Sequence, residues 1–166
     1  MRAMTILLGL AALAMVAAPA AYGAESRTNS RAAKQLERGR YLLTVGNCND
    51  CHTDGYAPSN GNVPEKDWLL GSPLGLRGPW GTTYATNLRI SLSKMTEDQW
   101  VSYAKALKTR PPMPWFNLNQ WGDRDLRSFY RYVTHLGTAG KPAPQPLAPD
   151  QTPPPPYVQW PSPPKK

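Results

Sequence analysis

Apolar residues recur at helical spacing in three stretches of the chain. The first covers residues 32–45, the second starts at Thr96, and the third runs from Asp123 to Leu136. This spacing places apolar side chains on one face of each helix, so it predicts three amphipathic helices. The faces consist of Leu36, Tyr41, Leu42 and Val45 in the first stretch, Trp100, Tyr103, Ala104 and Leu107 in the second, and Leu126, Phe129, Tyr130, Val133 and Leu136 in the third.

Local signals mark the ends of these helices. Thr96-Glu97-Asp98-Gln99 is a capping box, in which the threonine caps the second helix and Gln99 reaches back to it. Gly122 is a candidate cap for the third helix, because it would put Trp121 and Leu126 in the hydrophobic-staple positions. Glycines follow the last apolar residues of the first and third helices, and they predict where both end.

Gly39 lies inside the first predicted helix. A glycine there weakens a helix by about 1 kcal/mol relative to alanine. It has a use if a second helix crosses closely at that point. We therefore expect the aromatic face of the third helix to pack against the Gly39 region of the first.

Glycine and proline punctuate the chain between the first two helices. Residues 53–95 contain Asp54-Gly55, Ser59-Asn60-Gly61, Gly71-Ser72-Pro73 and the run Arg77-Gly78-Pro79-Trp80-Gly81. Such punctuation excludes long regular elements. This part of the chain is expected to be a long irregular loop.

The composition changes again at Lys141. Eleven of the 26 residues from 141 to 166 are proline, which is typical of a polyproline II tail. A disordered extension is the favoured interpretation. Tyr157, Val158 and Trp160 offer the alternative of an anchor on a partner or back on the domain.

The N-terminus has the pattern of a secretory signal peptide. Residues 1–23 contain a single charge, Arg2, followed by an apolar run from Thr5 to Val16 and then by small residues. An uncleaved N-terminal anchor is the alternative. The chain therefore divides into a signal peptide (1–23), a globular domain (32–140) and a proline-rich tail (141–166), and the protein is expected to be exported to the periplasm.

Candidate chemistry is concentrated in Cys48-Asn49-Asp50-Cys51-His52. This is the spacing that attaches a c-type haem, with two cysteine thioethers and the adjacent histidine as an axial ligand of the iron. A redox CxxC motif would lie in a βαβ context, which the pattern does not predict here. A structural zinc site needs four ligands, whereas the chain has only two cysteines and two histidines, His52 and His135.

A second axial ligand would complete a six-coordinate centre, and Met113 is the strongest candidate. It lies in Thr109-Arg110-Pro111-Pro112-Met113-Pro114, where the prolines fix an extended backbone that can present a thioether. Met95 precedes the Thr96 cap and is better explained by packing in a hydrophobic staple. His135, at the end of the third helix, and an open site remain as further alternatives.

The net charge of the chain is +8. A basic surface attracts acidic partners and accelerates their encounter with the protein. The alternative is that the charge only keeps the protein soluble. Nucleic acid is not an expected partner, since the chain has no recognition motif for it.

Several motifs occur in the order found in class I cytochromes c. They are Gly39-x-Tyr41-Leu42, the run 81–87 (Gly-Thr-Thr-Tyr-Ala-Thr-Asn), Pro112-Met113-Pro114, and Asp125-Leu126-x-x-x-Tyr130-x-Tyr132. Over about residues 36–137 the chain most resembles the haem modules in cytochrome subunits of periplasmic alcohol, gluconate and nicotinate dehydrogenases. Those subunits usually have several modules, whereas this chain has one haem motif.

The resemblance implies an all-α, single-domain fold in which the N- and C-terminal helices cross around one covalent haem. It implies that Cys48 and Cys51 bind the haem and that His52 and Met113 are the axial iron ligands. Eight loop residues are expected to pack on the haem or the helices: Trp68, Leu69, Leu70, Leu74, Leu76, Trp80, Tyr84 and Leu88.

The predicted function is single-electron transfer without catalysis of a substrate reaction. The expected partners are redox proteins, such as a periplasmic dehydrogenase and a terminal oxidase or another cytochrome, with no membrane span after signal cleavage. A haem enzyme (a peroxidase or a sulfur-compound oxidoreductase) and a haem-based sensor are the alternatives.

Overall fold

The computed structural model describes residues 18–162, with side chains from residue 27 onward. The chain divides into two units, residues 1–33 and 34–166. Helix α1 (Ala18–Val45) begins in the first unit and ends in the second. Residues 1–17 of the predicted signal peptide lie outside the described part of the chain. Within that part, none of the helices combines the length and the apolar character that crossing a membrane requires.

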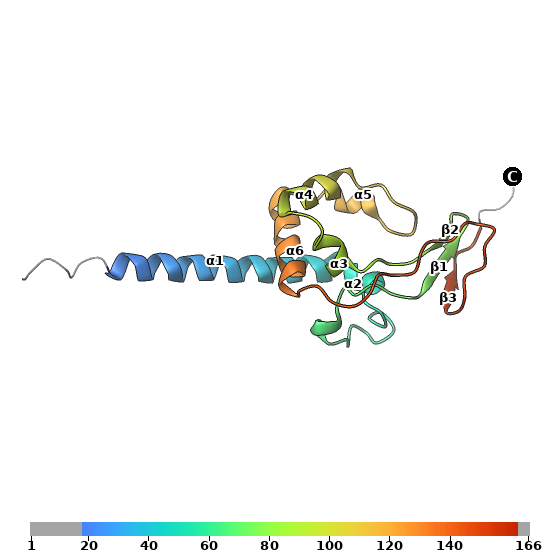
Figure 1. Cartoon of the computed structure of the whole chain (residues 1–166), viewed down its shortest axis with the longest axis horizontal. Helices are drawn as coiled ribbons and strands as arrows, with labels where there is room; N and C mark the ends of the chain where they lie inside the picture. The colour runs from blue at the N-terminus through green and yellow to red at the C-terminus, as the bar shows by residue number, and fades with distance from the viewer. Residues whose placement is uncertain (1–17, 163–166) are drawn as a thin grey trace, which may run out of the picture. The chain divides into compact units, whose positions relative to one another are not determined.

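The second unit contains short helices and a small sheet (Figure 1). Its further elements are α2 (Cys48–His52), a 3-10 helix (Glu65–Asp67), β1 (Gly75–Gly78), β2 (Gly81–Thr83), α3 (Leu88–Leu92), α4 (Glu97–Ala106), α5 (Trp115–Leu118), α6 (Asp123–His135) and β3 (Tyr157–Gln159).

The predicted second and third helices are present with the predicted caps. Thr96 caps α4, and both hydrogen bonds of the capping box form with Gln99. Gly122 is the N-cap of α6, which ends at His135. The first helix ends at Val45 as predicted, but it begins at Ala18 instead of residue 32. Residues 24–31 contain neither proline nor glycine, so no helix-breaking residue interrupts the helix directly before position 32, and Pro19 lies in its first turn, where proline is tolerated.

Helices α1 and α6 cross at Gly39, as predicted. A Cβ atom at Gly39 would overlap the Ser128 carbonyl oxygen and lie 2.6 Å from the Tyr132 Cβ. Glycine therefore allows the two backbones to approach directly. The main core surrounds this crossing and contains Leu43, Trp68, Leu69, Leu92, Trp100, Val101, Ala104, Leu126, Phe129, Tyr132 and Val133.

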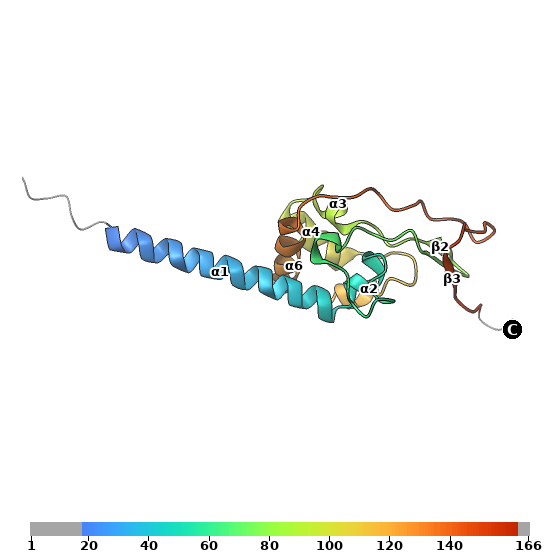
Figure 2. The ribbon, with the colours of Figure 1, turned by 90° about the horizontal axis from the view of Figure 1, so that it is seen from below.

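The prediction of a disordered tail is wrong. The tail leaves α6 and returns to the sheet, where β3 pairs in parallel with β1 (Figures 1 and 2). The strand order is β2-β1-β3, with β1 and β2 antiparallel. Residues between the prolines keep their backbone donors and acceptors, so they can pair with the edge of β1. The all-α expectation did not include this sheet.

Candidate haem-binding site

The Cys48–His52 motif forms one short helix, α2. Asn47 has a φ of 55°, in the left-handed region, and turns the chain between the end of α1 and the start of α2. Within α2, Cys48, Cys51 and His52 stand in an i, i+3, i+4 relation, which places them on one face of the helix. On a helix, this spacing directs both sulfurs and the imidazole toward the same face of α2.

The opposite side of α2 is anchored by a buried polar chain. The Asn49 side chain is 1% exposed, and its Oδ1 accepts a hydrogen bond of 2.6 Å from the Thr53 hydroxyl. The Thr53 oxygen in turn accepts one of 2.8 Å from the Leu69 backbone N–H. The Gly71 N–H donates to the His52 carbonyl at 2.8 Å. These bonds fix α2 against residues 69–71, so the helix is held in one orientation relative to the rest of the domain.

The imidazole of His52 is oriented by a backbone contact. Its Nδ1 lies 2.7 Å from the Thr86 carbonyl oxygen, which makes Nδ1 the protonated nitrogen. Nε2 is then left as the coordinating nitrogen, the arrangement in which a second partner fixes a metal-ligating histidine. Burial lowers the pKa of His52, with the Thr86 contact opposing this shift, so the ring is kept neutral as ligation requires.

The two thiols differ from those of a redox CxxC pair. Burial raises the pKa of the Cys48 thiol to about 12 and also raises the pKa of the Cys51 thiol. Redox-active CxxC cysteines instead have lowered pKa values that favour the thiolate. Both shifts disfavour the thiolate form in α2.

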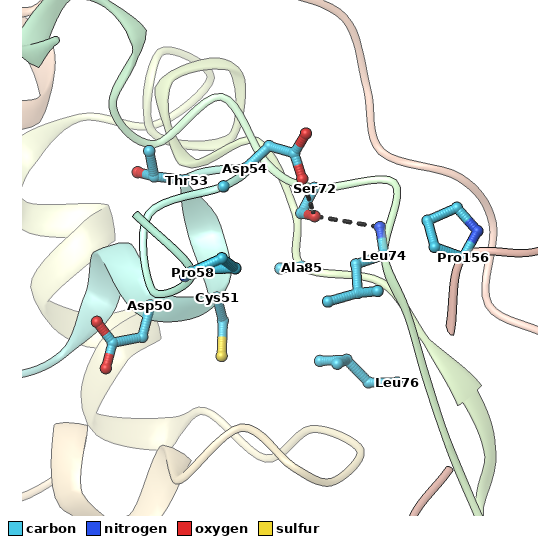
Figure 3. Close-up of a pocket in the computed structure, with 11 residues that line it drawn as sticks. Asp50, Cys51, Thr53, Asp54, Pro58, Ser72, Leu74, Leu76, Ala85 and Pro156 are labelled. Atoms are coloured by element: carbon cyan, nitrogen blue, oxygen red, sulfur yellow. Dashed lines mark hydrogen bonds between the residues drawn. The ribbon is translucent and has the colours of Figure 1, made fainter. Parts of the chain in front are cut away.

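A cavity of about 250 Å³ lies beside Cys51. Figure 3 shows the Cys51 sulfur projecting into the open space that Leu74 and Leu76 border on the other side. Ala85 and Pro156 add apolar wall, while Asp50 and Asp54 add carboxylates to the lining. Asp54 is held by the Ser72 hydroxyl at 2.7 Å. The lining includes Cys51 but not Cys48, His52 or Met113, and Cys48 packs against the helical core. A covalent haem requires two thiols, an oriented imidazole and apolar wall, and the structure provides these groups around α2 without joining them in one cavity.

Met113 lies on a separate loop that is tied to the site indirectly. It is partly buried and precedes α5. The Thr83 hydroxyl, in β2, donates to the Pro111 carbonyl at 2.9 Å. Three residues further along, Thr86 holds His52. One segment, residues 83–86, therefore contacts both the predicted proximal ligand and the loop of the predicted sixth ligand.

The two other candidate ligands have different surroundings. The Met95 carbonyl accepts a 2.7 Å hydrogen bond from the Tyr130 hydroxyl, so the backbone at Met95 is tied to α6. His135 is exposed at the end of α6. Within residues 27–162, no group of three or more His, Cys, Asp and Glu side chains gathers in a way that could hold a metal ion.

The eight loop residues expected around the haem or the helices lie in several environments. Tyr84 is buried and Leu70 is partly buried. Trp68 and Leu69 belong to the helical core, and Leu88 packs against it. Leu74 and Leu76 line the cavity at Cys51. Trp80 lies 6.2 Å from Trp160, between ring centroids, and so contacts the tail.

Three contributors to the site were not predicted: Asn49, Thr83 and Thr86. Asn49 and Thr83 act through side chains directed at distant segments, and Thr86 acts through its backbone carbonyl. Any residue type can supply a backbone carbonyl, so the contact with His52 could not be predicted from the identity of residue 86. The acceptor for the second ring nitrogen of His52 lies in the glycine- and proline-rich stretch 53–95, at the Thr86 carbonyl.

Comparison with known proteins gives one distant likeness. The cytochrome subunit of fructose dehydrogenase from Gluconobacter japonicus is 28% identical to the chain over 124 residues. The alignment covers 66% of this chain and 23% of the relative, so the chain spans about a quarter of the relative's length. No family model and no solved structure matches the chain. The likeness supports, in coarse terms, a cytochrome-type module with an electron-transfer role.

Proposed function

We propose that this protein is a periplasmic monohaem c-type cytochrome with a class I cytochrome c-like fold, which passes single electrons between redox proteins. The observation that carries the proposal is that Cys48, Cys51 and His52 lie on the one short helix α2 at the haem-attachment spacing, with the His52 Nδ1 held 2.7 Å from the Thr86 carbonyl. When bound, a haem supplies a one-electron iron couple.

The residues of the chain would hold and insulate that group. Cys48 and Cys51 would fix it through thioethers, and His52 would offer Nε2 in a set orientation. Met113 would supply a thioether from the proline-fixed loop, and a methionine opposite a histidine raises the reduction potential. Leu74, Leu76, Ala85 and Pro156 line the cavity at Cys51 and would provide apolar surface for the haem to pack against.

A dehydrogenase is the proposed electron donor. The relative from Gluconobacter japonicus is a cytochrome subunit of such an enzyme. The net charge of +8 favours a partner with an acidic docking surface. The role of this chain is then that of the electron-accepting component, with no bond to the organic substrate.

Covalent attachment is tested by replacing Cys51 with alanine. The wild-type chain, expressed with a c-type maturation system, should stain for haem on a denaturing gel, and Cys51→Ala should stain much more weakly because one thioether is lost. Equal staining of the two proteins would overturn the proposed attachment. A high-spin ferric spectrum that responds readily to cyanide would point to a haem enzyme instead.

The sixth ligand is tested by Met113→Ala, with Met95→Ala as the matched control. Axial ligands tune haem potentials over about 0.8 V, so Met113→Ala should lower the potential by something on the order of 0.1 V or more. Met95→Ala should leave the potential near that of the wild type. A potential that responds to Met95 and not to Met113 would transfer the assignment to Met95.

A further inference from the structure

The proline-rich segment 141–160, called the strap below, is hydrogen-bonded to β1 and β2. Leu147 and Thr82 exchange two backbone hydrogen bonds of 3.0 Å each. The Gly75 N–H donates to the Pro156 carbonyl at 3.1 Å, and the Trp160 N–H donates to the Arg77 carbonyl at 2.7 Å. The strap is therefore attached at three successive points of the hairpin, and Figures 1 and 2 show its course from α6 to the sheet.

Leu147 is the point where the strap, β2 and the Met113 loop meet. Its carbonyl oxygen accepts from the Thr82 N–H and also from the Arg110 Nη1, at 3.3 Å. Gly81 makes this approach possible. It has a φ of 95°, and a Cβ there would overlap the Leu147 carbonyl oxygen and lie 3.0 Å from the Ala148 carbonyl carbon. The contact is thus built for close backbone apposition.

The strand held by Leu147 also contacts the loop that bears Met113. Thr83, the neighbour of Thr82, donates from its hydroxyl to the Pro111 carbonyl. Arg110, which reaches the strap directly, lies three residues before Met113. The loop is therefore fixed to the strap by one direct hydrogen bond and by a second route through β2.

We propose that the strap positions the sixth ligand, by clamping β2 and the Met113 loop so that the thioether stays at the iron. This inference rests on the proposed His52 and Met113 ligation. A thioether is a weak, neutral ligand, so its occupancy depends on how firmly the surrounding backbone holds it. The backbone of α2, which bears His52, is also anchored outside the strap, at Thr53 and Gly71.

The test compares two truncations of the haem-loaded full chain. The first ends at Lys141 and lacks the rest of the strap, residues 142–160, and the second ends at Trp160 and keeps it. Ferric protein is titrated with imidazole, which competes with a methionine ligand. Without the strap, the apparent affinity for imidazole should rise about tenfold, the factor that corresponds to one or two lost hydrogen bonds. The chain that ends at Trp160 should stay within about twofold of the full chain, because every hydrogen bond named above is retained.

A point variant covers the case in which the short chain fails to load haem. Leu147→Pro removes the N–H that donates to the Thr82 carbonyl and places a ring against the strand, within a segment that already holds proline on both sides of the position. It should also raise the imidazole affinity while leaving the haem covalently attached. Arg110→Gln isolates the direct route and should give a smaller rise.

Two results would overturn the inference, and they are distinguishable. If the full chain shows a ferric methionine–iron absorption band and neither the truncation at Lys141 nor Leu147→Pro changes the imidazole affinity, the strap has no positioning role. If the full chain lacks that band and binds imidazole as tightly as Met113→Ala does, the proposed ligation itself fails and the role of the strap fails with it.

Discussion

Replacing Gly39 with alanine gives a direct test of the helix crossing. The new methyl group would overlap the Ser128 carbonyl oxygen and stand 2.6 Å from the Tyr132 Cβ and 2.9 Å from the Ser128 carbonyl carbon. Two of these three neighbours are backbone atoms, so no side-chain rotation relieves the overlap. The helices α1 and α6 must separate.

The expected magnitude is a difference between two opposing effects. Alanine favours a helix interior over glycine by about 1 kcal/mol. Overpacking costs about 1–3 kcal/mol and occasionally more, and a clash with backbone belongs at the upper end of this range. The net loss in the free energy of unfolding is then about 2 kcal/mol, which lowers the Tm of a domain of this size by roughly 8 °C.

Guanidinium titration of the haem-loaded protein, followed by circular dichroism, measures this loss. Gly122→Ala is the matched control, because a Cβ at Gly122 meets nothing within 4 Å. The control should lose only about 0.5 kcal/mol, from a poorer N-cap. A Gly39→Ala protein as stable as the parent would refute the close crossing, since the methyl group would then have found room.

Two further perturbations probe other parts of the fold. Arg89 is 7% exposed and donates to the carbonyls of Leu136, Gly137 and Lys66. Arg89→Ala should therefore lower the free energy of unfolding by about 3 kcal/mol in the same titration. Arg89→Lys should recover only part of this loss, because one ammonium group cannot replace the several donors of the guanidinium. Hydrogen bonds from Arg131 and then Arg127 lower the pKa of Glu97 below its ordinary value of 4.5. The stability that this carboxylate contributes is therefore complete above pH 4.5. It is lost as the pH falls through the lowered pKa of the folded state. The difference in unfolding free energy between the wild type and Glu97→Gln should therefore shrink on acidification from pH 7 to about pH 3, and a difference independent of pH would contradict this reasoning.

The features that could be predicted from the sequence are encoded locally. The Thr96 cap and its Gln99 partner lie within one helical turn, and both bonds form. Gly39 was informative because a glycine inside a helix needs a reason, and the nearby aromatic face of α6 supplied one. The α2 face follows directly from the spacing of Cys48, Cys51 and His52.

The unpredicted features depend on the path of the chain between distant residues. The His52–Thr86 contact joins residues 34 apart, and the Thr83–Pro111 contact joins residues 28 apart. Neither leaves a periodic pattern, since one uses a backbone carbonyl and the other a lone hydroxyl. The strap differs from the predicted disordered tail for a related reason: a proline-rich composition shows that a segment is extended, but it does not show whether a strand edge is free to receive it.

The parallel pairing of β3 with β1 also sets an order of events in time. Pro156, which lines the cavity, follows Cys51 by 105 residues, so this wall is made long after the cysteines. A chain that folds as it emerges has α1, α2 and the hairpin available while the last strand is still missing. Pairing between segments so distant in sequence is also slow to form. Until β3 has paired with β1, the cavity at Cys51 lacks its Pro156 wall, so a bulky group can enter from that side.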